Sequence, residues 1–199
     1  MHEQALIIFV KNPEKGQVKT RLAADVGDDR ALQIYRELLR HTREVVTQVP
    51  ALRLLFYAQY IPKADEWPLS SFEKHLQPSG DLGERMQAAF SQALSRVNKA
   101  VIVGSDCASL TPQIVIEAFA KLAQHDVVIG PALDGGYYLL GMKTVHPKLF
   151  ENMIWSTPSV FAETVQRMQQ AGLSWAELPR LSDIDYKEDW DRYGWPIED

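Results

Sequence analysis

Several features that would define a class of protein are scarce or missing in this sequence. It has a single cysteine, Cys107, so neither an intramolecular disulfide nor a zinc site with Cys/His spacing can form. The longest buried-looking apolar run, residues 5–10, is far too short to cross a bilayer. The N-terminus lacks the basic start and the small-residue cleavage site of a secretory signal. These absences lead us to expect a cytoplasmic protein with no membrane span.

The chain also has no excess of positive charge. The 26 acidic residues outnumber the 21 lysines and arginines, which gives a formal net charge of −5. Nucleic acids and anionic membranes are bound by basic faces, so we expect neither as a partner. The acid excess lies in residues 183–199, because acids and bases balance over residues 1–182. The net charge therefore says little about a site elsewhere in the chain.

Flexible linkers, low-complexity segments and internal repeats are missing as well. A chain of 199 residues can bury about 70% of the surface that its unfolded form exposes. The hydrophobic share of 46% and the charged share of 24% are typical of a globular protein. We therefore expect one domain over residues 1–199. The five tryptophans and seven tyrosines would be enough to build a homo-oligomer interface, although the sequence does not place one.

Short apolar segments alternate with amphipathic ones along the chain. Segments typical of buried strands are 5–10, 52–58, 100–104, 126–132 and 136–142, followed by a weaker candidate at 173–178. Helical spacing of apolar residues covers 35–49, 86–97 and 115–122, and helix starts are indicated at Thr111-Pro112 and Thr157-Pro158. This alternation predicts an α/β fold, a Rossmann-like three-layer sandwich with a mostly parallel sheet.

The strands at 126–132 and 136–142 break this rhythm. Only three residues, 133–135, separate them, so no crossover helix fits between the two. One of the two strands must run against the others, which makes the predicted sheet mixed. In such sheets ligands bind at the carboxyl ends of the strands, so the loops that follow the strands are expected to hold the binding and catalytic residues.

The loop after the first strand is rich in cations. Lys19 offers a mobile point charge and Arg21 a planar fork, which together suit a diphosphate. Gly16 lets backbone N–H groups turn inward, and Thr20 adds a hydroxyl donor. With Lys11 at its start, we favour an anion site here over a merely solvated loop. The spacing is neither that of a Walker loop nor that of a dinucleotide fingerprint.

Acidic residues follow the third strand and recur in the tail. Asp106, after Gly104-Ser105, could hold a hard cation such as Mg²⁺ or Mn²⁺, and Ser105 could contact the ligand beside it. Asp183 and Asp185 lie on the same side of an extended backbone, so either could be the second ligand. The alternatives are a turn aspartate and a solvated helix start. Cys107 is expected to be a packed side chain rather than a nucleophile.

Two glycine-containing turns are further candidates. In residues 78–86 a helix start could receive a phosphate, with Asp81 and Arg85 as contacts, or Asp81 could be an ordinary helix cap. In residues 133–138, Asp134 could bind or deprotonate an acceptor beside Tyr137 and Tyr138, or the segment could be a plain hairpin turn. Residues 155–157 are a weaker candidate for the edge of a pocket.

These motifs, taken in order, resemble a known family. The matching segments are FVKNPEKGQVKTRLA, GDLGERM, VIVGSD, GPALDGGYYLLG, IWST and LSDIDYKEDW, which together span about residues 5–190. The chain resembles the bacterial GT-A-type glycosyltransferase-like family DUF2064, the transferase 1 associated with radical-SAM and selenodomain proteins. The resemblance implies a nucleotide-diphospho-sugar transferase fold and, more distantly, similarity to molybdenum-cofactor and phospholactate guanylyltransferases.

The resemblance also implies roles for individual residues. Lys11, Lys19 and Arg21 match the phosphate-facing loop, Asp106 the metal-binding aspartate, and Asp185 a second metal ligand in the tail. Two departures stand out: the loop has only Gly16 where guanylyltransferase relatives carry several glycines, and only Asp106 remains of the DXD motif of many GT-A enzymes.

We therefore hypothesise a transferase that uses a nucleotide-sugar donor with Mg²⁺ or Mn²⁺ as cofactor and an unknown acceptor. Lys19, Arg21 and Asp134 would be its catalytic residues. One alternative is a guanylyltransferase-like enzyme that acts on an NTP and a phosphorylated acceptor. Another is a non-catalytic nucleotide-binding module.

Overall fold

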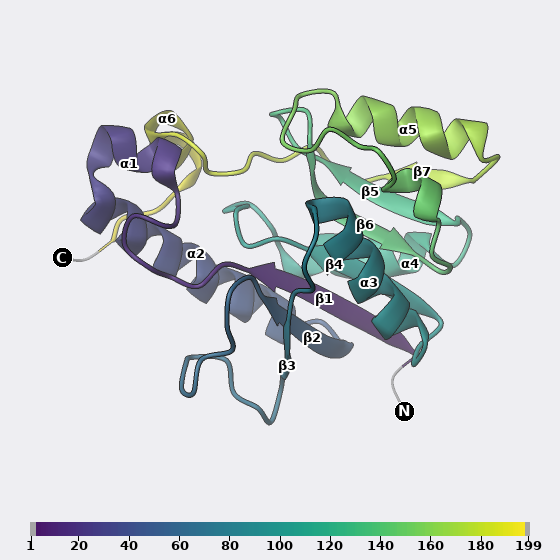
Figure 1. The fold of residues 1–199 in the computed structure, drawn as a ribbon, viewed down its shortest axis with the longest axis horizontal. Helices are drawn as coiled ribbons and strands as arrows, with labels where there is room; N and C mark the ends of the chain where they lie inside the picture. Colours follow the sequence, from purple (N-terminus) through teal and green to yellow (C-terminus); the bar gives the residue numbers. More distant parts are fainter. Residues whose placement is uncertain (1–2, 198–199) are drawn as a thin grey trace.

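One mixed sheet crosses the molecule in the strand order β3-β2-β1-β4-β6-β5-β7 (Figure 1). The computed structural model describes residues 3–197. Its strands are β1 (Gln4–Val10), β2 (Leu52–Tyr57), β3 (Glu73–Leu76), β4 (Lys99–Val103), β5 (Val127–Pro131), β6 (Tyr137–Met142) and β7 (Trp175–Glu177). β1 pairs in parallel with β2 and β4, whereas β6 runs antiparallel to both β4 and β5. The expected reversal within the late strand pair is confirmed.

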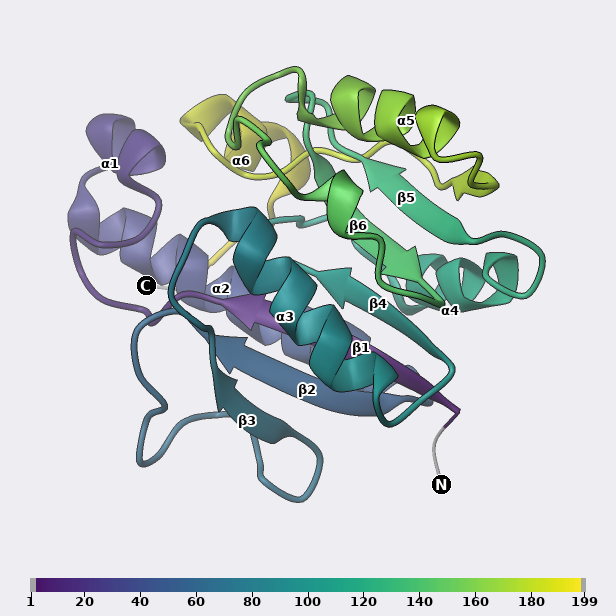
Figure 2. The ribbon, with the colours of Figure 1, turned by 45° about the vertical axis from the view of Figure 1, so that its right-hand side comes forward.

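Helices cover both faces of this sheet. They are α1 (Thr20–Val26), α2 (Asp28–Thr47), α3 (Leu82–Leu94), α4 (Pro112–Lys121), α5 (Val160–Gln170), α6 (Lys187–Tyr193) and a short 3₁₀ turn, η1 (Pro147–Leu149). α2 and α4 pack on one face, and α3 and α5 on the other (Figure 2). The predicted three-layer α/β architecture is confirmed. None of the described helices is long and apolar enough to span a membrane.

The alternation of side chains along β1 shows why the chain folds into three layers. Leu6 and Ile8 join the cluster beneath α2 and α4, while Ala5 and Ile7 join the cluster beneath α3 and α5. All four side chains are fully buried. Because both faces are covered, the strand reads as a continuous apolar run in the sequence.

Two elements were not predicted, and one helix start was misplaced. β3 is an edge strand that pairs only with β2 among the described strands, and none of its four residues is buried, so it has no apolar run. α1 is only seven residues long, and only Leu22 is buried in it. α5 begins at Val160 instead of at Thr157-Pro158, because the hydroxyl of Thr157 donates to the carbonyl of Ile154 and does not cap the helix.

The β5–β6 turn is pinned to the start of α5. Asp134 Oδ1 accepts a hydrogen bond from the backbone N–H of Gly136 at 2.9 Å. Gly135 has φ +91°, and a Cβ added there would lie 2.1 Å from the carbonyl oxygen of Pro158. The turn therefore requires glycine at this position for both its conformation and its space.

Gly135→Ala is expected to lower the free energy of unfolding by about 3 kcal/mol, because alanine is strained at this φ and also collides with backbone. Urea unfolding would measure the change. Gly172→Ala is the matched control, since Gly172 has φ +66° but nothing within 4 Å of an added Cβ. It should cost only about 1 kcal/mol, and equal losses in the two variants would contradict the steric argument.

Candidate functional site

A cleft of about 1000 Å³ opens at the carboxyl ends of β1 and β4. Most of its walls come from four parts of the chain: the segment from β1 into α1, the residue Asp106 after β4, the β5–β6 turn with the residues around the start of α5, and the tail from Ser182 to α6. Tyr35 of α2 and Leu82 of α3 line it as well. This is the edge of the sheet at which an open α/β fold binds its ligands. The loops that carry the predicted site residues therefore meet at the carboxyl ends of the strands, as expected.

Lys19 lies at the centre of the cleft. Its backbone is left-handed, with φ 50°, which ends the loop after β1 and starts α1. Its ammonium is 2.6 Å from Asp106 Oδ1 and donates to the carbonyl oxygen of Ile184 at 2.6 Å. The Lys19 side chain is only 5% exposed. A buried ammonium thus joins the first loop, the end of β4 and the tail.

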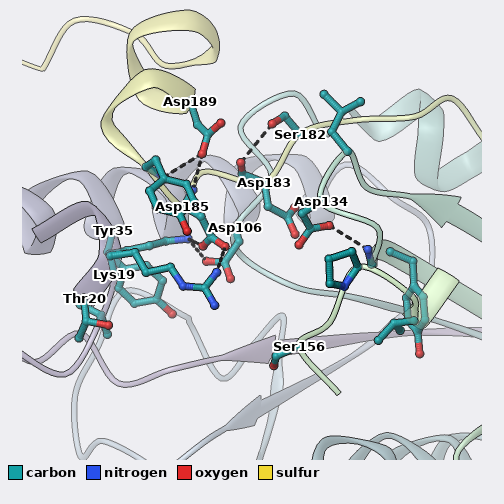
Figure 3. Close-up of a pocket in the computed structure, with 18 of the residues that line it drawn as sticks. Lys19, Thr20, Tyr35, Asp106, Asp134, Ser156, Ser182, Asp183, Asp185 and Asp189 are labelled. Carbon is teal, nitrogen blue, oxygen red and sulfur yellow. Dashed lines mark hydrogen bonds and ion pairs between the residues drawn. The ribbon is translucent and has the colours of Figure 1, made fainter. Parts of the chain in front are cut away.

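Asp185 provides a second link between the loop and the tail (Figure 3). Its Oδ2 accepts a hydrogen bond from Arg21 Nη1 at 3.1 Å, and its Oδ1 is 3.9 Å from Lys19 Nζ. The guanidinium of Arg21 also lies over the ring of Tyr186, 6.0 Å from its centroid. Asp106 and Asp185, distant in sequence, therefore approach the same ammonium from two sides.

Asp183 points into the same group of acids. Burial, followed by the negative charge of Asp106, raises the pKa of the Asp183 carboxyl to about 7, although Lys19 opposes the rise. Asp134 and Asp185 also raise this pKa. The charges of Asp106, Asp134 and Asp185 are therefore all close enough to disfavour a charged Asp183. Within residues 3–197, no set of three or more acidic, cysteine or histidine side chains is already arranged to hold a metal ion.

Acidic side chains outnumber basic ones along the cleft. The described lining contains six carboxylates, those of Asp106, Asp134, Asp183, Asp185, Glu188 and Asp189. It contains four cations, those of Lys11, Lys19, Arg21 and Arg192. A phosphate-bearing ligand would thus meet net negative charge, unless a cation entered with it.

Most of the site residues predicted from the sequence line this one cleft. They are Lys11, Lys19, Thr20, Arg21, Asp106, Asp134 and Asp185. Asp183, the alternative tail acid, lines it as well, and so do residues 155–158. Four predicted binding residues lie outside the lining: Gly16, Asp81, Arg85 and Ser105.

Each of these four residues has a local structural role outside the cleft. Asp81 caps α3 by accepting from the N–H of Glu84 at 2.9 Å, which is the ordinary cap that the sequence left open. Arg85 donates through Nε to the carbonyl of Gly80 at 2.9 Å. Gly16 has φ +74° and serves a turn. Ser105 is buried beneath the cleft, 5% exposed.

Tyr35 is a lining residue that the sequence pattern did not reveal. Its hydroxyl accepts from the N–H of Lys11 at 2.8 Å, donates to the Lys11 carbonyl at 3.2 Å, and lies 3.2 Å from Ser105 Oγ. Burial is the main reason why its pKa is raised. In sequence it is one more apolar position on the stripe of α2. Its hydroxyl fixes the loop after β1 to the loop after β4.

Tyr35→Phe is expected to lower the free energy of unfolding by about 1–2 kcal/mol, because the buried N–H of Lys11 loses its acceptor. Chemical denaturation would measure this. Tyr60→Phe is a suitable comparison: its hydroxyl also forms a hydrogen bond, to Glu14, but the residue is 48% exposed. A loss from Tyr35→Phe no larger than that from Tyr60→Phe would contradict a structural role for this hydroxyl.

The lining residues of the tail helix and the left-handed backbone of Ser156 were not predicted. Tyr186, Asp189, Arg192 and Tyr193 line the cleft from α6 and the residue before it. Asp189 Oδ2 accepts from the N–H groups of Asp185 and Tyr186 at 3.0 and 2.8 Å, which fixes the position of Asp185. Ser156 has φ +62° and lines the cleft, a conformation invisible in sequence. A helix start after the tail acids was one of the alternatives that the sequence left open, and α6 begins there.

Two further expectations concern Cys107 and the tyrosines. Cys107 is 4% exposed, and burial raises the pKa of its thiol to about 12, so it packs as expected and is not a poised thiolate. Tyr137 lines the cleft, but Tyr138 is buried under the sheet's other face and donates to the carbonyl of Pro179. The expectation that both tyrosines lie beside a bound acceptor was therefore wrong for Tyr138, because neighbouring residues on a strand point to opposite faces.

The fold and this cleft define a three-layer α/β protein with a charged site at the carboxyl ends of its central strands. The chain belongs to the family described as uncharacterized protein conserved in bacteria (DUF2064), whose model matches residues 38–157. No curated protein matches the sequence.

Solved structures support this assignment. A Desulfovibrio desulfuricans G20 protein, described provisionally as a nucleotide-diphospho-sugar transferase, is 33% identical with a TM-score of 0.87, over 94% of this chain and 84% of that one. The expected nucleotide-diphospho-sugar transferase fold is thereby confirmed. The inositol-1-phosphate CTP transferase of T. maritima shares the fold at 12% identity and a TM-score of 0.61, over 94% and 91% of the chains. A Mycobacterium tuberculosis H37Rv protein solved with manganese shares it at 10% identity and a TM-score of 0.56, over 97% and 98%.

Proposed function

We propose that the protein is a transferase that binds a nucleotide-sugar donor in the cleft, together with Mg²⁺ or Mn²⁺, and passes the sugar to an acceptor. The main support is the buried ammonium of Lys19, held by Asp106 and approached by Asp185 where the strands end. The 33% identical relative described as a nucleotide-diphospho-sugar transferase points to the same chemistry.

The side chains fit a divalent cation by their chemistry. Asp106 and Asp185 both face the Lys19 ammonium with a carboxylate oxygen, and carboxylate oxygens are ligands that Mg²⁺ and Mn²⁺ prefer. The excess of acids over bases in the lining also favours a ligand that brings positive charge. When bound, the cation would neutralise the diphosphate and stabilise the departing nucleoside diphosphate. Asp106 and Asp185 would hold it, with Asp183 as the neighbouring acid.

The remaining polar groups would act on the two substrates. Lys19 and Arg21 would bind diphosphate oxygens, with Lys11 and the hydroxyl of Thr20 further along the same wall. These groups act in a fixed arrangement, because Lys19 is already held by Asp106 and by the carbonyl of Ile184, and Arg21 by Asp185. Asp134 would bind the acceptor and take its proton, since its side chain is exposed at the β5–β6 turn.

Nucleotidyl transfer is the second candidate. It is favoured by the fold shared with the T. maritima CTP transferase, which at 12% identity shows architecture alone. The two reactions differ in their products. A nucleotidyltransferase would release pyrophosphate from an NTP, whereas a glycosyltransferase would release a nucleoside diphosphate from its donor.

Calorimetric titration would test the proposal with UDP-glucose, GDP-mannose, dTDP-glucose, CTP and GTP, each with and without Mg²⁺ or Mn²⁺. We expect one nucleotide-sugar to bind at least 10-fold more tightly with the metal than with EDTA. Leu69→Ser serves as a control variant, because Leu69 is 78% exposed and lies outside the cleft lining. Metal-dependent binding of an NTP alone, with pyrophosphate release, would favour the second candidate. No binding of any nucleotide would refute both.

A further inference from the structure

The two ends of the cleft differ in charge. All four lining cations among the described residues come from the β1–α1 segment or from α6. The end between the β5–β6 turn and α5 is lined by apolar side chains, those of Leu82, Leu133, Tyr137, Trp155, Pro158 and Val160. The charged lining residue of the β5–β6 turn, Asp134, is an acid, and its charge reaches the neighbouring acid Asp183. Figure 3 shows Asp134 on the opposite side of the site from Lys19 and Thr20.

Contacts between segments bring these apolar residues together. A Cβ added at Gly83, next to Leu82, would lie 2.7 Å from the ring of Trp155, so the start of α3 packs on that ring. The N–H of Phe161 in α5 donates to the carbonyl of Gly135 at 2.8 Å, which holds the β5–β6 turn against α5. Trp155 and Leu133 are thus fixed parts of one end of the cleft.

Large apolar side chains remain exposed at this end. Leu82 is 42% exposed, Leu133 56% and Ile154, beside Trp155, 72%. Such residues scattered singly are normal, but a group of them at the mouth of a polar cleft is typical of a binding surface. A ligand with an apolar body would cover them.

The nearby groups that could attract a phosphate are already engaged. The guanidinium of Arg85 donates to the carbonyl of Gly80. The start of α3 is covered by the carboxylates of Asp81 and Glu84, which form a capping box. At α5, the N–H of Phe161 is taken by Gly135. A phosphate here would meet carboxylates and apolar surface, both of which disfavour it.

We infer that the acceptor is a phosphate-free alcohol with an apolar or aromatic body, bound between Leu133 and Trp155 with its hydroxyl at Asp134. This inference rests on the proposed function and names the acceptor class for it. In the reaction the acceptor oxygen bonds to the anomeric carbon of the donor sugar, while the bond from that carbon to the diphosphate oxygen breaks. The diphosphate keeps the bonding electrons, and the hydroxyl proton passes to the Asp134 carboxylate.

A matched pair of probes tests this acceptor class directly. Calorimetry with the full chain would compare 4-nitrophenyl β-D-glucopyranoside with 4-nitrophenyl phosphate, which shares the aryl group but carries a phosphate. Each would be titrated alone and in the presence of UDP and Mg²⁺. We expect the glucoside to bind at least 10-fold more tightly than the phosphate ester in both conditions.

Two variants locate the binding. Leu133→Ser should weaken the binding of the glucoside by about 5–10-fold, because the ligand would no longer cover the apolar side chain of Leu133. Leu69→Ser, which changes an exposed leucine outside the lining, should leave it unchanged. Equal or tighter binding of the phosphate ester, no binding of the glucoside, or an unchanged affinity in Leu133→Ser would overturn the inference.

Titration of UDP with Mg²⁺ on the same sample separates the two claims. If UDP fails to bind while the glucoside binds as expected, the donor proposal fails and the apolar subsite stands. If UDP binds but the phosphate ester is preferred, the acceptor inference fails and the donor proposal stands.

Discussion

Replacing Lys19 with methionine is expected to abolish nucleotide binding and to lower the free energy of unfolding by about 2 kcal/mol. The ammonium is 5% exposed and bonded to Asp106 and to the carbonyl of Ile184, so methionine leaves both acceptors unpaired. Removing one partner of a fully buried ion pair costs about 3–5 kcal/mol. The expected loss for Lys19→Met is smaller because the Asp106 side chain is 45% exposed and water screens its charge.

The loss should be specific to the cleft. Lys15→Met is the matched control, because Lys15 comes from the same loop but pairs with Asp29 at the surface, where the two side chains are 57% and 84% exposed. Exposed pairs contribute about 0–1 kcal/mol, so this variant should bind nucleotide and unfold nearly as the parent does. Urea unfolding and calorimetry would measure both. Similar losses in the two variants would show that general loop charge, rather than the buried ammonium, is responsible.

The metal offers a second measurement on the same variant. Without Lys19, the carboxylates of Asp106 and Asp183 repel each other without its opposing charge, while Asp185 keeps its ion pair with Arg21. Mg²⁺ should therefore raise the melting temperature of Lys19→Met more than that of the parent protein. An equal shift in both proteins would argue against a cation site formed by these acids.

The buried strands could be predicted from the sequence because burial on both faces leaves a plain apolar run. β1 and β4 have almost no exposed side chains, so their boundaries were found to within one residue. β3 and α1 are held by few buried contacts, so their sequences carry no clear period. The reversal of β6 was predictable for a different reason: a three-residue connection cannot hold a crossover.

The candidate site was only partly predictable, because its geometry depends on contacts across the chain. The position of Asp106 after a strand was visible, but its bond to Lys19 depends on the left-handed backbone at Lys19, which no pattern indicates. Tyr35 looks like any core residue of α2 until its hydroxyl is placed between Lys11 and Ser105. Sequence therefore indicates which loops matter, while long-range hydrogen bonds decide which side chains face the ligand.

The charge of the chain illustrates the same limit. In sequence the loop after β1 is locally basic and the tail is acidic, which suggests a cationic site and a separate acidic end. In the structure the two combine in one cleft, where Lys19 and Arg21 are held by Asp106 and Asp185. The anion site expected from the loop is thus also the place where a cation is needed.

Asp106→Asn is expected to weaken metal-dependent nucleotide binding by about 100-fold or more while leaving the fold nearly intact. Asparagine keeps an oxygen that can accept from Lys19, so the bond at 2.6 Å would be weakened rather than lost. It removes the negative charge, and a hard cation held by two carboxylates would lose one of them. The affinity for the nucleotide in EDTA should change much less than the affinity in Mg²⁺, because only the metal-bound form depends on that charge.

Asp81→Asn is the control variant, and it tests whether the ligand site ends before the start of α3. Asp81 lies outside the lining and caps α3, and asparagine is an equally good cap, so both stability and nucleotide affinity should match the parent. Calorimetry in Mg²⁺ and in EDTA would supply all four affinities. If Asp106→Asn binds as the parent does in Mg²⁺, the carboxylate after β4 holds no cation, and Lys19 and Arg21 would have to neutralise the diphosphate. If Asp81→Asn loses affinity as well, the ligand extends past Leu82 to the start of α3, and the apolar end of the cleft is shorter than its lining indicates.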